Sequence, residues 1–228
     1  MYIGEPSLKK HMLPSVPFRF TATEPIKLEA AKYVTKSFLD VLESRRSSRE
    51  FAPLDLAKLG AFLYLSNRIK RTDCNELGQE ITYTNCSSPG AMNALHLLLR
   101  RPSDRRWYSY DPLKHELGFL GDDIDCDGFI AHMCHELIPA TDTAWIIWNV
   151  ADLESLKCKY QNPQSLAYRH SGGISATHAL VAQALGLSYC QLGIMGESEA
   201  SKLSDKRELL GVGLAFLGDS PDNSTTID

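Results

Sequence analysis

A dense group of arginines and serines lies between Glu43 and Phe51, where the chain reads Glu-Ser-Arg-Arg-Ser-Ser-Arg-Glu-Phe. Arginine offers fork-shaped charged donors and serine offers a hydroxyl, and together these groups suit a phosphate. A solvated, charged helix end has the same composition, and composition alone favours that simpler interpretation. The segment is therefore a candidate phosphate site whose support must come from its context.

Two turns built from small residues are candidates for close contact with a ligand. The first reads Cys-Ser-Ser-Pro-Gly-Ala-Met-Asn over residues 86–93, and the second reads Leu-Ser-Tyr-Cys-Gln-Leu-Gly-Ile over residues 187–194. Small residues and glycine let backbone amides approach a flat ring closely. Taken alone, each segment is more simply a turn or a helix–strand connection without a ligand.

A lysine–tyrosine pair, Lys159-Tyr160, precedes the block Ala167-Tyr168-Arg169. A lysine in an apolar pocket can lose its proton and act as a base, and a tyrosine can donate a hydrogen bond to a substrate. At a helix end such a pair is more often ordinary surface.

The cluster His132, His135 and Glu136 raises the alternative of a metal-dependent hydrolase. The cluster lacks the His-Glu-x-x-His order and a clear third ligand, so we expect no metal site there. The sequence also lacks a Gly-x-Gly-x-x-Gly loop, a Walker loop and a Gly-x-Ser-x-Gly elbow, which removes the usual nucleotide-fold and hydrolase interpretations.

Taken in order, the arginine–serine segment and the two small-residue turns resemble the FMN-binding nitroreductase family. Arg-Arg-Ser-x-Arg-x-Phe after a helix is similar to the family segment that holds the flavin phosphate and ribityl chain. The two turns are similar to loops that lie beside and over the flavin ring. The resemblance implies flavin contacts for Arg45, Ser47 and Arg49, with Arg46 as a weaker candidate, for Ser88 and Gly90, and for Gly193.

Further segments resemble the SagB-type dehydrogenase branch of this family. Tyr108-Ser109-Tyr110-Asp111-Pro112 and Lys114-His115-Glu116-Leu117 are similar to two of its blocks, as are Lys159-Tyr160 and Ala167-Tyr168-Arg169. Some members of the branch oxidise azolines to azoles in ribosomally made peptides. The resemblance implies that Lys159 and Tyr160 are catalytic and that Arg169 pairs with the flavin or with a carboxylate.

The resemblance as a whole implies an FMN oxidoreductase that works as a homodimer with the flavin at the interface. It would use NAD(P)H to reduce a small electrophile of the nitro or quinone type, or dehydrogenate a peptide-derived heterocycle. A catalytically degenerate binding or partner protein with a flavin fold is the alternative. Ser87, Gln191 and Ile194 depart from the family pattern, and Gly218-Asp219 stands where many members carry a basic residue.

The bulk composition is that of an ordinary globular protein. The chain has 228 residues, 43% of them hydrophobic and 23% charged, and its formal net charge of −4 argues against non-specific nucleic-acid binding. The longest apolar run, near Ala144–Val150, is too short to span a bilayer, and Met1–Phe20 has no apolar signal region. With six cysteines and no Cys-x-x-Cys pair, the sequence predicts a cytoplasmic protein with reduced thiols and no membrane association.

Periodicity predicts an α+β domain, a mostly antiparallel central sheet with helices packed against it. We expect residues 1–35 to form a proline-rich extended arm that embraces a partner subunit, residues 36–218 the flavin-binding domain and residues 219–228 a disordered tail. Residues 72–90 read as a loop-rich stretch. One predicted helix ends near Leu42, and a second begins after Pro53 with Asp55 at its start. Three more predicted helices cover Phe129–Leu137, Leu153–Tyr160 and Gly173–Leu187. The predicted strands are Ala94–Leu99, Trp107–Tyr110, Thr143–Val150 and Gly213–Leu217.

Overall fold

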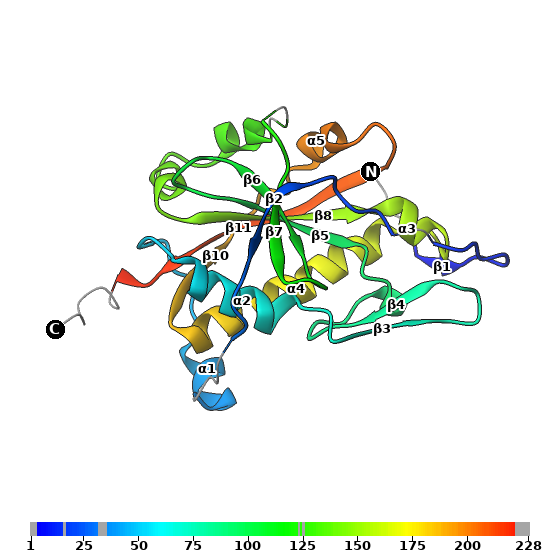
Figure 1. The fold of residues 1–228 in the computed structure, drawn as a ribbon, viewed down its shortest axis with the longest axis horizontal. Coiled ribbons are helices and arrows are strands. Elements are labelled where there is room, and N and C mark those ends of the chain that lie inside the picture. Colours follow the sequence, from blue (N-terminus) through cyan, green and yellow to red (C-terminus); the bar gives the residue numbers. More distant parts are fainter. Residues whose placement is uncertain (1–3, 16, 32–35, 123, 125, 222–228) are drawn as a thin grey trace.

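A computed structural model describes residues 4–15, 17–31, 36–122, 124 and 126–221. A central sheet of seven strands, all paired antiparallel, runs in the order β10-β11-β8-β5-β6-β7-β2 (Figure 1). Its strands are β2 (Thr23–Lys27), β5 (Leu95–Arg100), β6 (Trp107–Asp111), β7 (Glu116–Phe119), β8 (Trp145–Asp152), β10 (Leu187–Gln191) and β11 (Leu209–Asp219). The predicted α+β class with an antiparallel sheet is confirmed.

The two central strands are almost continuously apolar because helices or turns cover both of their faces. All eight residues of β8 are buried, as are ten of the eleven in β11. Tryptophan, isoleucine and valine favour a pleated, buried strand. Strand β11 is much longer than the predicted Gly213–Leu217, because it pairs with β8 along one edge and with β10 along the other. Asp219, expected to begin the tail, ends this strand, and residues 222–228 lie outside the described residues.

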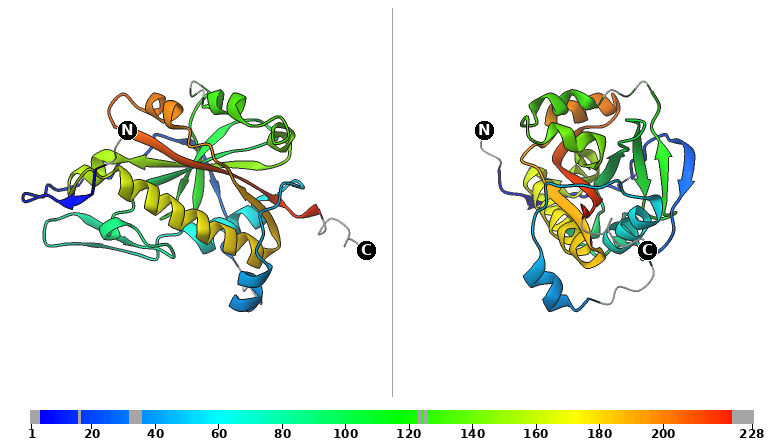
Figure 2. Two further views of the ribbon diagram at one scale, coloured as in Figure 1. Left: turned by 180° about the vertical axis from the view of Figure 1, so that it is seen from behind. Right: turned by 90° about the vertical axis from the view of Figure 1, so that its left-hand side faces the viewer.

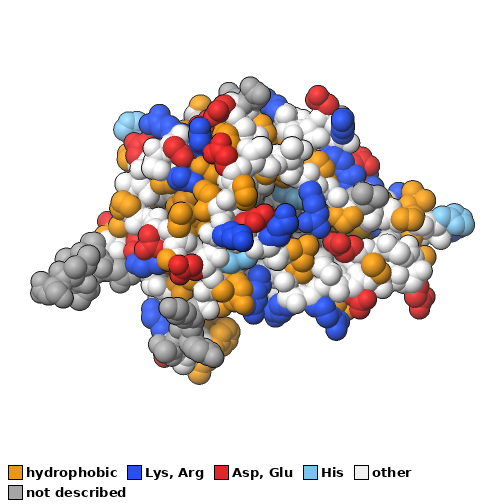
Figure 3. All heavy atoms as spheres, viewed as in Figure 1, with side chains coloured by type: hydrophobic (Ala, Val, Ile, Leu, Met, Phe, Trp, Pro, Cys, Tyr) orange, Lys and Arg blue, Asp and Glu red, His pale blue; other side chains and the backbone are white. Residues whose placement is uncertain are grey.

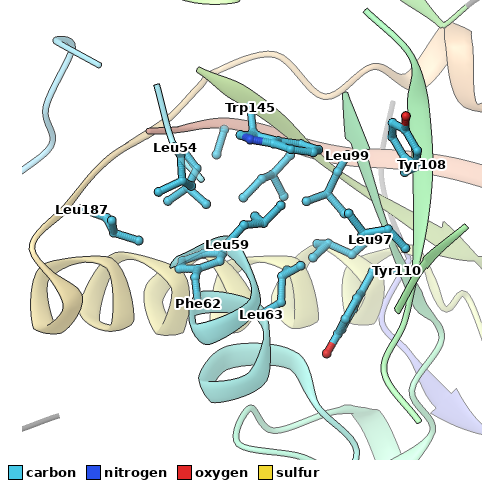
Figure 4. Close-up of a cluster of buried hydrophobic side chains, with 14 of the residues drawn as sticks. Leu54, Leu59, Phe62, Leu63, Leu97, Leu99, Tyr108, Tyr110, Trp145 and Leu187 are labelled. Carbon is cyan, nitrogen blue, oxygen red and sulfur yellow. The ribbon is translucent and has the colours of Figure 1, made fainter. Parts of the chain in front are cut away.

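Helices α2 (Leu56–Asn67) and α4 (Gln164–Leu185) cover one face of the sheet (Figures 1 and 2). Asp55 caps α2 as predicted, since its carboxylate accepts a hydrogen bond of 2.7 Å from Lys58 N. Leu59, Phe62 and Leu63 of α2 are fully buried against Leu97, Leu99 and Trp145 of the sheet (Figure 4).

The opposite face is covered by short elements. They are the 3₁₀ segments η2 (Asp127–His132), η3 (Ile138–Asp142) and η4 (Ser201–Leu203) and helix α5 (Glu197–Ala200). The predicted helix over Phe129–Leu137 is therefore wrong. Phe129 in η2 and Met133 directly after it do bury their side chains, but η2 ends at His132, and η3 starts only at Ile138, with Pro139 in its first turn where no amide proton is needed.

Helix α4 starts directly after Pro163, nine residues before the predicted start at Gly173. The paired glycines Gly172 and Gly173 lie inside this helix rather than before it. Its buried face is largely polar, with His170, Ser171, Ser175 and His178 turned toward the sheet and α2. Leu180, Val181, Ala184 and Leu185 are only partly buried, and Val181 and Leu185 pack against the core. Gly186 ends the helix in a left-handed conformation, φ 72°.

The remaining elements differ from the sequence prediction in detail. Residues 72–90 contain a hairpin, β3 (Arg71–Cys74) and β4 (Glu80–Tyr83), and a 3₁₀ turn η1 (Pro89–Ala91), where only loops were expected. The helix predicted over Leu153–Tyr160 ends earlier, as α3 (Leu153–Lys157), and Tyr160 begins strand β9 (Tyr160–Gln161). Helix α1 (Phe38–Ser44) lies where it was predicted.

The described part of the N-terminal segment packs on its own chain. Strand β1 (Ser7–Leu8) pairs with β9, and β2 forms the outer strand of the central sheet. Between them, Phe18 and Phe20 pack edge-on against His96 at ring-centroid distances of 5.4 and 5.2 Å. The segment therefore contributes to the core of the domain that follows it.

Buried His178 makes a pH-dependent contribution to stability that can be measured. Burial lowers the pKa of His178 to about 3, and its Nε2 lies 2.6 Å from Asn67 Oδ1. Between an unfolded pKa of about 6.5 and the lowered folded value, the unfolded chain binds the additional proton, so the unfolding free energy falls as pH falls, by up to about 1.4 kcal/mol per pH unit for this residue.

We expect the unfolding free energy of the His178→Gln variant to fall less steeply than that of the native protein between pH 7 and pH 4, by up to about 1.4 kcal/mol per pH unit, because the variant lacks this titrating group. Denaturant unfolding at a series of pH values measures the slope. His135→Gln, at an exposed position, is the matched control and should keep the native slope. A native slope retained by His178→Gln would contradict the assignment.

Candidate functional site

The arginine–serine segment follows α1 and runs beside strand β10. The Ser48 amide donates a 3.1 Å hydrogen bond to Tyr189 O, and Ser188 Oγ donates to Ser48 Oγ at 3.2 Å. Arg49 lies next to Cys190, where burial raises the pKa of the thiol and the charge and hydrogen bond of Arg49 oppose that rise. The structure thus brings the first and third candidate segments together.

Four residues of this region, Arg45, Arg46, Ser47 and Arg49, are exposed, and we call them the arginine group. No carboxylate among the described residues forms an ion pair with any of its three guanidinium groups. Gly193, in the turn after β10, borders open space, since a Cβ there would have no neighbour within 4 Å. Three uncompensated cations beside an open turn suit a phosphate-bearing ligand.

A second set of candidates, Ser88, Gly90, Lys159 and Tyr160, forms what we call the loop group. Gly90 has φ 58°, and a Cβ at this position would lie 2.7 Å from both Lys159 Nζ and Tyr160 Oη. The left-handed backbone favours glycine here, and a larger residue would have to displace the tips of Lys159 and Tyr160. Burial raises the pKa of Tyr160, so its hydroxyl stays protonated at neutral pH and can donate a hydrogen bond.

The arginine group and the loop group lie near different points along helix α4. Gln183 Nε2 donates a 3.1 Å hydrogen bond to Ser44 Oγ, next to the arginine group. Gly173 faces the loop group's turn, since a Cβ there would lie 3.3 Å from Cys86 Sγ. These positions are ten residues apart, which corresponds to about 15 Å along a helix. One copy of the chain therefore presents the two groups at separate places.

Other predicted residues lie outside both groups. Arg169 is exposed on α4, and no side-chain hydrogen bond or ion pair ties it to another described residue. Tyr108 and Tyr110, the two tyrosines of strand β6, are buried in the core, where Tyr108 Oη donates to Asp104 and Tyr110 Oη lies 2.9 Å from His115 Nδ1. In this chain the tyrosine strand has a packing role.

The residues that fix the arginine group in place could not be identified from the sequence. Ser48 and Ser188 join the segment to β10, but the sequence gives no sign of a pairing between residues 140 positions apart.

His132, His135 and Glu136 lie on the exposed side of η2 and the turn that follows. Within the described ranges, no group of three or more His, Cys, Asp or Glu side chains is placed to hold a metal ion, and no helix is long and apolar enough to cross a membrane.

Comparisons of the sequence give no match among protein-family models and none among curated proteins. Solved structures do match the fold. A proposed nitroreductase of Ralstonia eutropha JMP134 superposes with a TM-score of 0.66 at 18% identity, over 95% of this chain and 98% of that one.

Two further matches concern a flavin complex and a multi-protein assembly. A proposed nitroreductase from Desulfovibrio desulfuricans in complex with FMN gives a TM-score of 0.51 at 18% identity, over 85% of this chain and 92% of that one. A chain of the Escherichia coli microcin synthetase McbBCD complex, solved with truncated pro-MccB17 bound, gives 0.54 at 16% identity, over 84% and 76%. The chain described here has the nitroreductase fold.

Proposed function

We propose that this protein is an FMN-dependent oxidoreductase that acts as a homodimer. The observation that carries the proposal is the arginine group: three exposed guanidinium groups without an ion-pair partner among the described residues, fixed beside β10 on a nitroreductase fold. Buried or paired arginines would have argued for a structural role instead. A structural neighbour in complex with FMN supports the choice of cofactor.

The residues present fit a flavin. Arg45 and Arg49, with Ser47, would hold its phosphate, and Arg46 would add a further cation. Gly193 leaves open space beside this position, and Gly90 together with Ser88 lets backbone approach a flat ring. When bound, FMN supplies hydride transfer, and the protein binds and orients it.

The separation of the two residue groups supports a dimer. A single flavin would contact both groups if the arginine group came from one copy and the loop group from the second. Helix α1 exposes Phe38, Leu39 and Leu42, with 66%, 67% and 47% of their surface accessible. Large apolar side chains gathered on one short helix are typical of a surface that another chain covers.

Lys159 and Tyr160 are the proposed catalytic pair. Lys159 Nζ and Tyr160 Oη converge on the Gly90 turn, so a substrate at this turn would meet one amine and one protonated hydroxyl. In a SagB-type dehydrogenation of a peptide-derived heterocycle, Lys159 would remove a proton and Tyr160 would donate a hydrogen bond. In the second form of the reaction, NAD(P)H-driven reduction of a small electrophile, Tyr160 would donate to the electrophile. Arg169, exposed on α4, would pair with the flavin or with a carboxylate of the substrate.

A partner subunit without catalysis is the second candidate, and one observation favours it. Asp219, the last residue of β11, stands where many family members carry a basic residue, and it pairs with Lys58 and bridges to Ala52. One of the structurally similar chains is part of the McbBCD complex, a multi-protein synthetase. Retention of FMN with turnover would exclude this candidate.

The test is the visible spectrum of the purified protein, with heat-released supernatant compared with an FMN standard. We expect a flavin band at about one FMN per chain, as holoenzyme or after reconstitution, and a dimeric mass by light scattering. A colourless protein that does not take up added FMN would contradict the cofactor proposal, and a stable monomer at micromolar concentration would contradict the dimer.

A further inference from the structure

The turn that joins β3 to β4 contains a buried glutamine. Gln79 is 0% exposed, whereas residues 76–78 before it are exposed. Asn75 Oδ1 accepts hydrogen bonds from the amides of Leu77 and Gln79, at 3.0 and 2.9 Å. Because backbone amides only donate, the other side-chain atom of Asn75 is its nitrogen, and this Nδ2 donates to Gln79 Oε1 at 2.9 Å. The side chain of Asn75 thereby fixes the orientation of the Gln79 amide.

The nitrogen of the Gln79 amide holds the N-terminal segment. Gln79 Nε2 donates a 2.7 Å hydrogen bond to Leu13 O, and the Leu13 amide donates a 3.0 Å bond to Cys158 O. The Leu13 side chain is 58% exposed, so hydrogen bonds of the main chain rather than apolar burial place this residue. The Lys9 amide donates to Lys159 O at 3.0 Å. Two consecutive carbonyls after α3 therefore accept hydrogen bonds from the N-terminal segment.

The same hairpin also contacts the turn that faces the proposed catalytic pair. Thr82 of β4 is 5% exposed, and its Oγ1 donates to Ala91 O at 3.4 Å, next to Gly90. Figure 1 shows the hairpin beside β1, at the end of the molecule where α3 lies. On the face drawn in Figure 3, charged, polar and apolar side chains are mixed at this end, so the surface gives no sign of these contacts. The hairpin is hydrogen-bonded to both halves of the loop group, directly to the Gly90 turn and through the N-terminal segment to Lys159–Tyr160.

We propose that Gln79 is a positioning residue for the Lys159–Tyr160 pair and acts through the main chain of Leu13. A Cβ at Gly90 would lie 2.7 Å from Lys159 Nζ and from Tyr160 Oη, so a small shift of their segment changes what a substrate meets at this turn. A displacement of about 1 Å can slow a reaction about 100-fold. The inference rests on the proposed function of Lys159 as a base, whereas the hydrogen bonds from Gln79 to Cys158 can be tested without it.

The first experiment measures whether Gln79 holds the N-terminal segment. Gln79→Met removes the donor and keeps the length of the side chain. We expect the amides of Lys9 and Leu13 to exchange their protons about tenfold faster in this variant, because the loss of a buried hydrogen bond makes local opening easier. Hydrogen exchange of the full chain, followed by mass spectrometry, resolves this segment. Glu76→Met, an exposed change in the same turn, is the matched control and should exchange as the native protein does.

The second experiment separates positioning from a general loss of structure. We expect Gln79→Met to lower kcat for azoline oxidation at least about tenfold. The KM for the peptide, the FMN content and the rate of NADPH-driven menadione reduction should stay within about twofold of the native values. In a Lys159→Ala background, Gln79→Met should have no further effect, because the base that it positions is gone.

Asn75→Asp provides a second variant with the same expected result. The introduced carboxylate still accepts the two backbone hydrogen bonds of the turn but has no donor for Gln79 Oε1. The Gln79 amide then turns its Nε2 toward the carboxylate and away from Leu13 O. Both the exchange of the N-terminal segment and kcat should change as in Gln79→Met.

Native exchange or a native kcat in Gln79→Met would overturn the proposal, as would a further loss in the Lys159→Ala background. Equal losses in azoline oxidation and menadione reduction would also overturn it, because they would show a general effect on the flavin site. If the native protein oxidises no azoline, the proposed function fails, and the exchange measurement still decides whether Gln79 holds the segment that carries Lys159. Should Gln79→Met fail to fold, Asn75→Asp decides in its place.

Discussion

Replacing Arg49 with alanine is expected to weaken FMN binding about 100-fold while leaving the fold intact. A guanidinium that meets a phosphate forms charge-assisted, often bidentate hydrogen bonds, each worth about 1.5–3 kcal/mol, so the loss of one such pair removes at least a factor of about 100. Arg49 is well placed for this role because its neighbour Ser48 is hydrogen-bonded to Tyr189 and its guanidinium lies beside Cys190.

The effect is measured as the dissociation of FMN when the holoprotein is diluted, which is monitored by the recovery of flavin fluorescence. Arg45→Ala should act in the same direction, and Arg49→Lys should restore part of the affinity, since lysine keeps the charge but not the fork. Arg105→Ala is the matched control, because Arg105 is also exposed, lies outside the arginine group and pairs with Asp142. Full retention of FMN by both Arg45→Ala and Arg49→Ala would remove the basis of the phosphate assignment.

Four of the seven strands of the central sheet, β5, β6, β8 and β11, were predictable because they carry their own signal, whereas β2, β7 and β10 were not predicted. Strand β8 combines tryptophan, isoleucine and valine, the residue types that favour a buried strand. The ends of elements were less predictable, because tertiary pairing extends them: β11 reaches eleven residues only because β8 and β10 flank it. The early start of α4 was hidden by Gly172 and Gly173, which usually interrupt helices, and by a buried face of histidines and serines that shows no apolar period.

The candidate site divides in the same way. The arginine–serine segment is local and could be read from adjacent residues. The convergence of Lys159 and Tyr160 on Gly90 joins positions about seventy residues apart and depends on how η1 meets β9. The hydrogen bonds that join Asn149 to Ser171 and Ser171 to Val212 could not be predicted either, because these residues are 22 and 41 positions apart in the sequence. Spacing reveals local chemistry, whereas contacts between distant residues arise only from the fold.

Replacing Lys159 with alanine is expected to slow azoline oxidation by at least about 100-fold with FMN still bound. General bases contribute about 10²- to 10⁴-fold to proton transfer. Lys159 Nζ lies at the Gly90 turn with Tyr160 Oη, so its removal leaves the protonated Tyr160 hydroxyl without a partner base. The rate is measured on a thiazoline-containing model peptide by the absorbance of the thiazole product, with FMN content determined on the same sample.

Lys157→Ala is the matched control for this change. Lys157 precedes the pair by two residues but pairs with Glu154 and Glu208 instead of meeting the turn, so its loss should leave the rate within about twofold, as for most surface changes. NADPH-driven reduction of menadione by Lys159→Ala should also stay close to the native rate, because that reaction removes no proton from carbon. Native azoline oxidation by Lys159→Ala would contradict the base assignment. Equal losses in both reactions would instead show that Lys159 positions the flavin, because a base acts on one reaction and a cofactor contact acts on both.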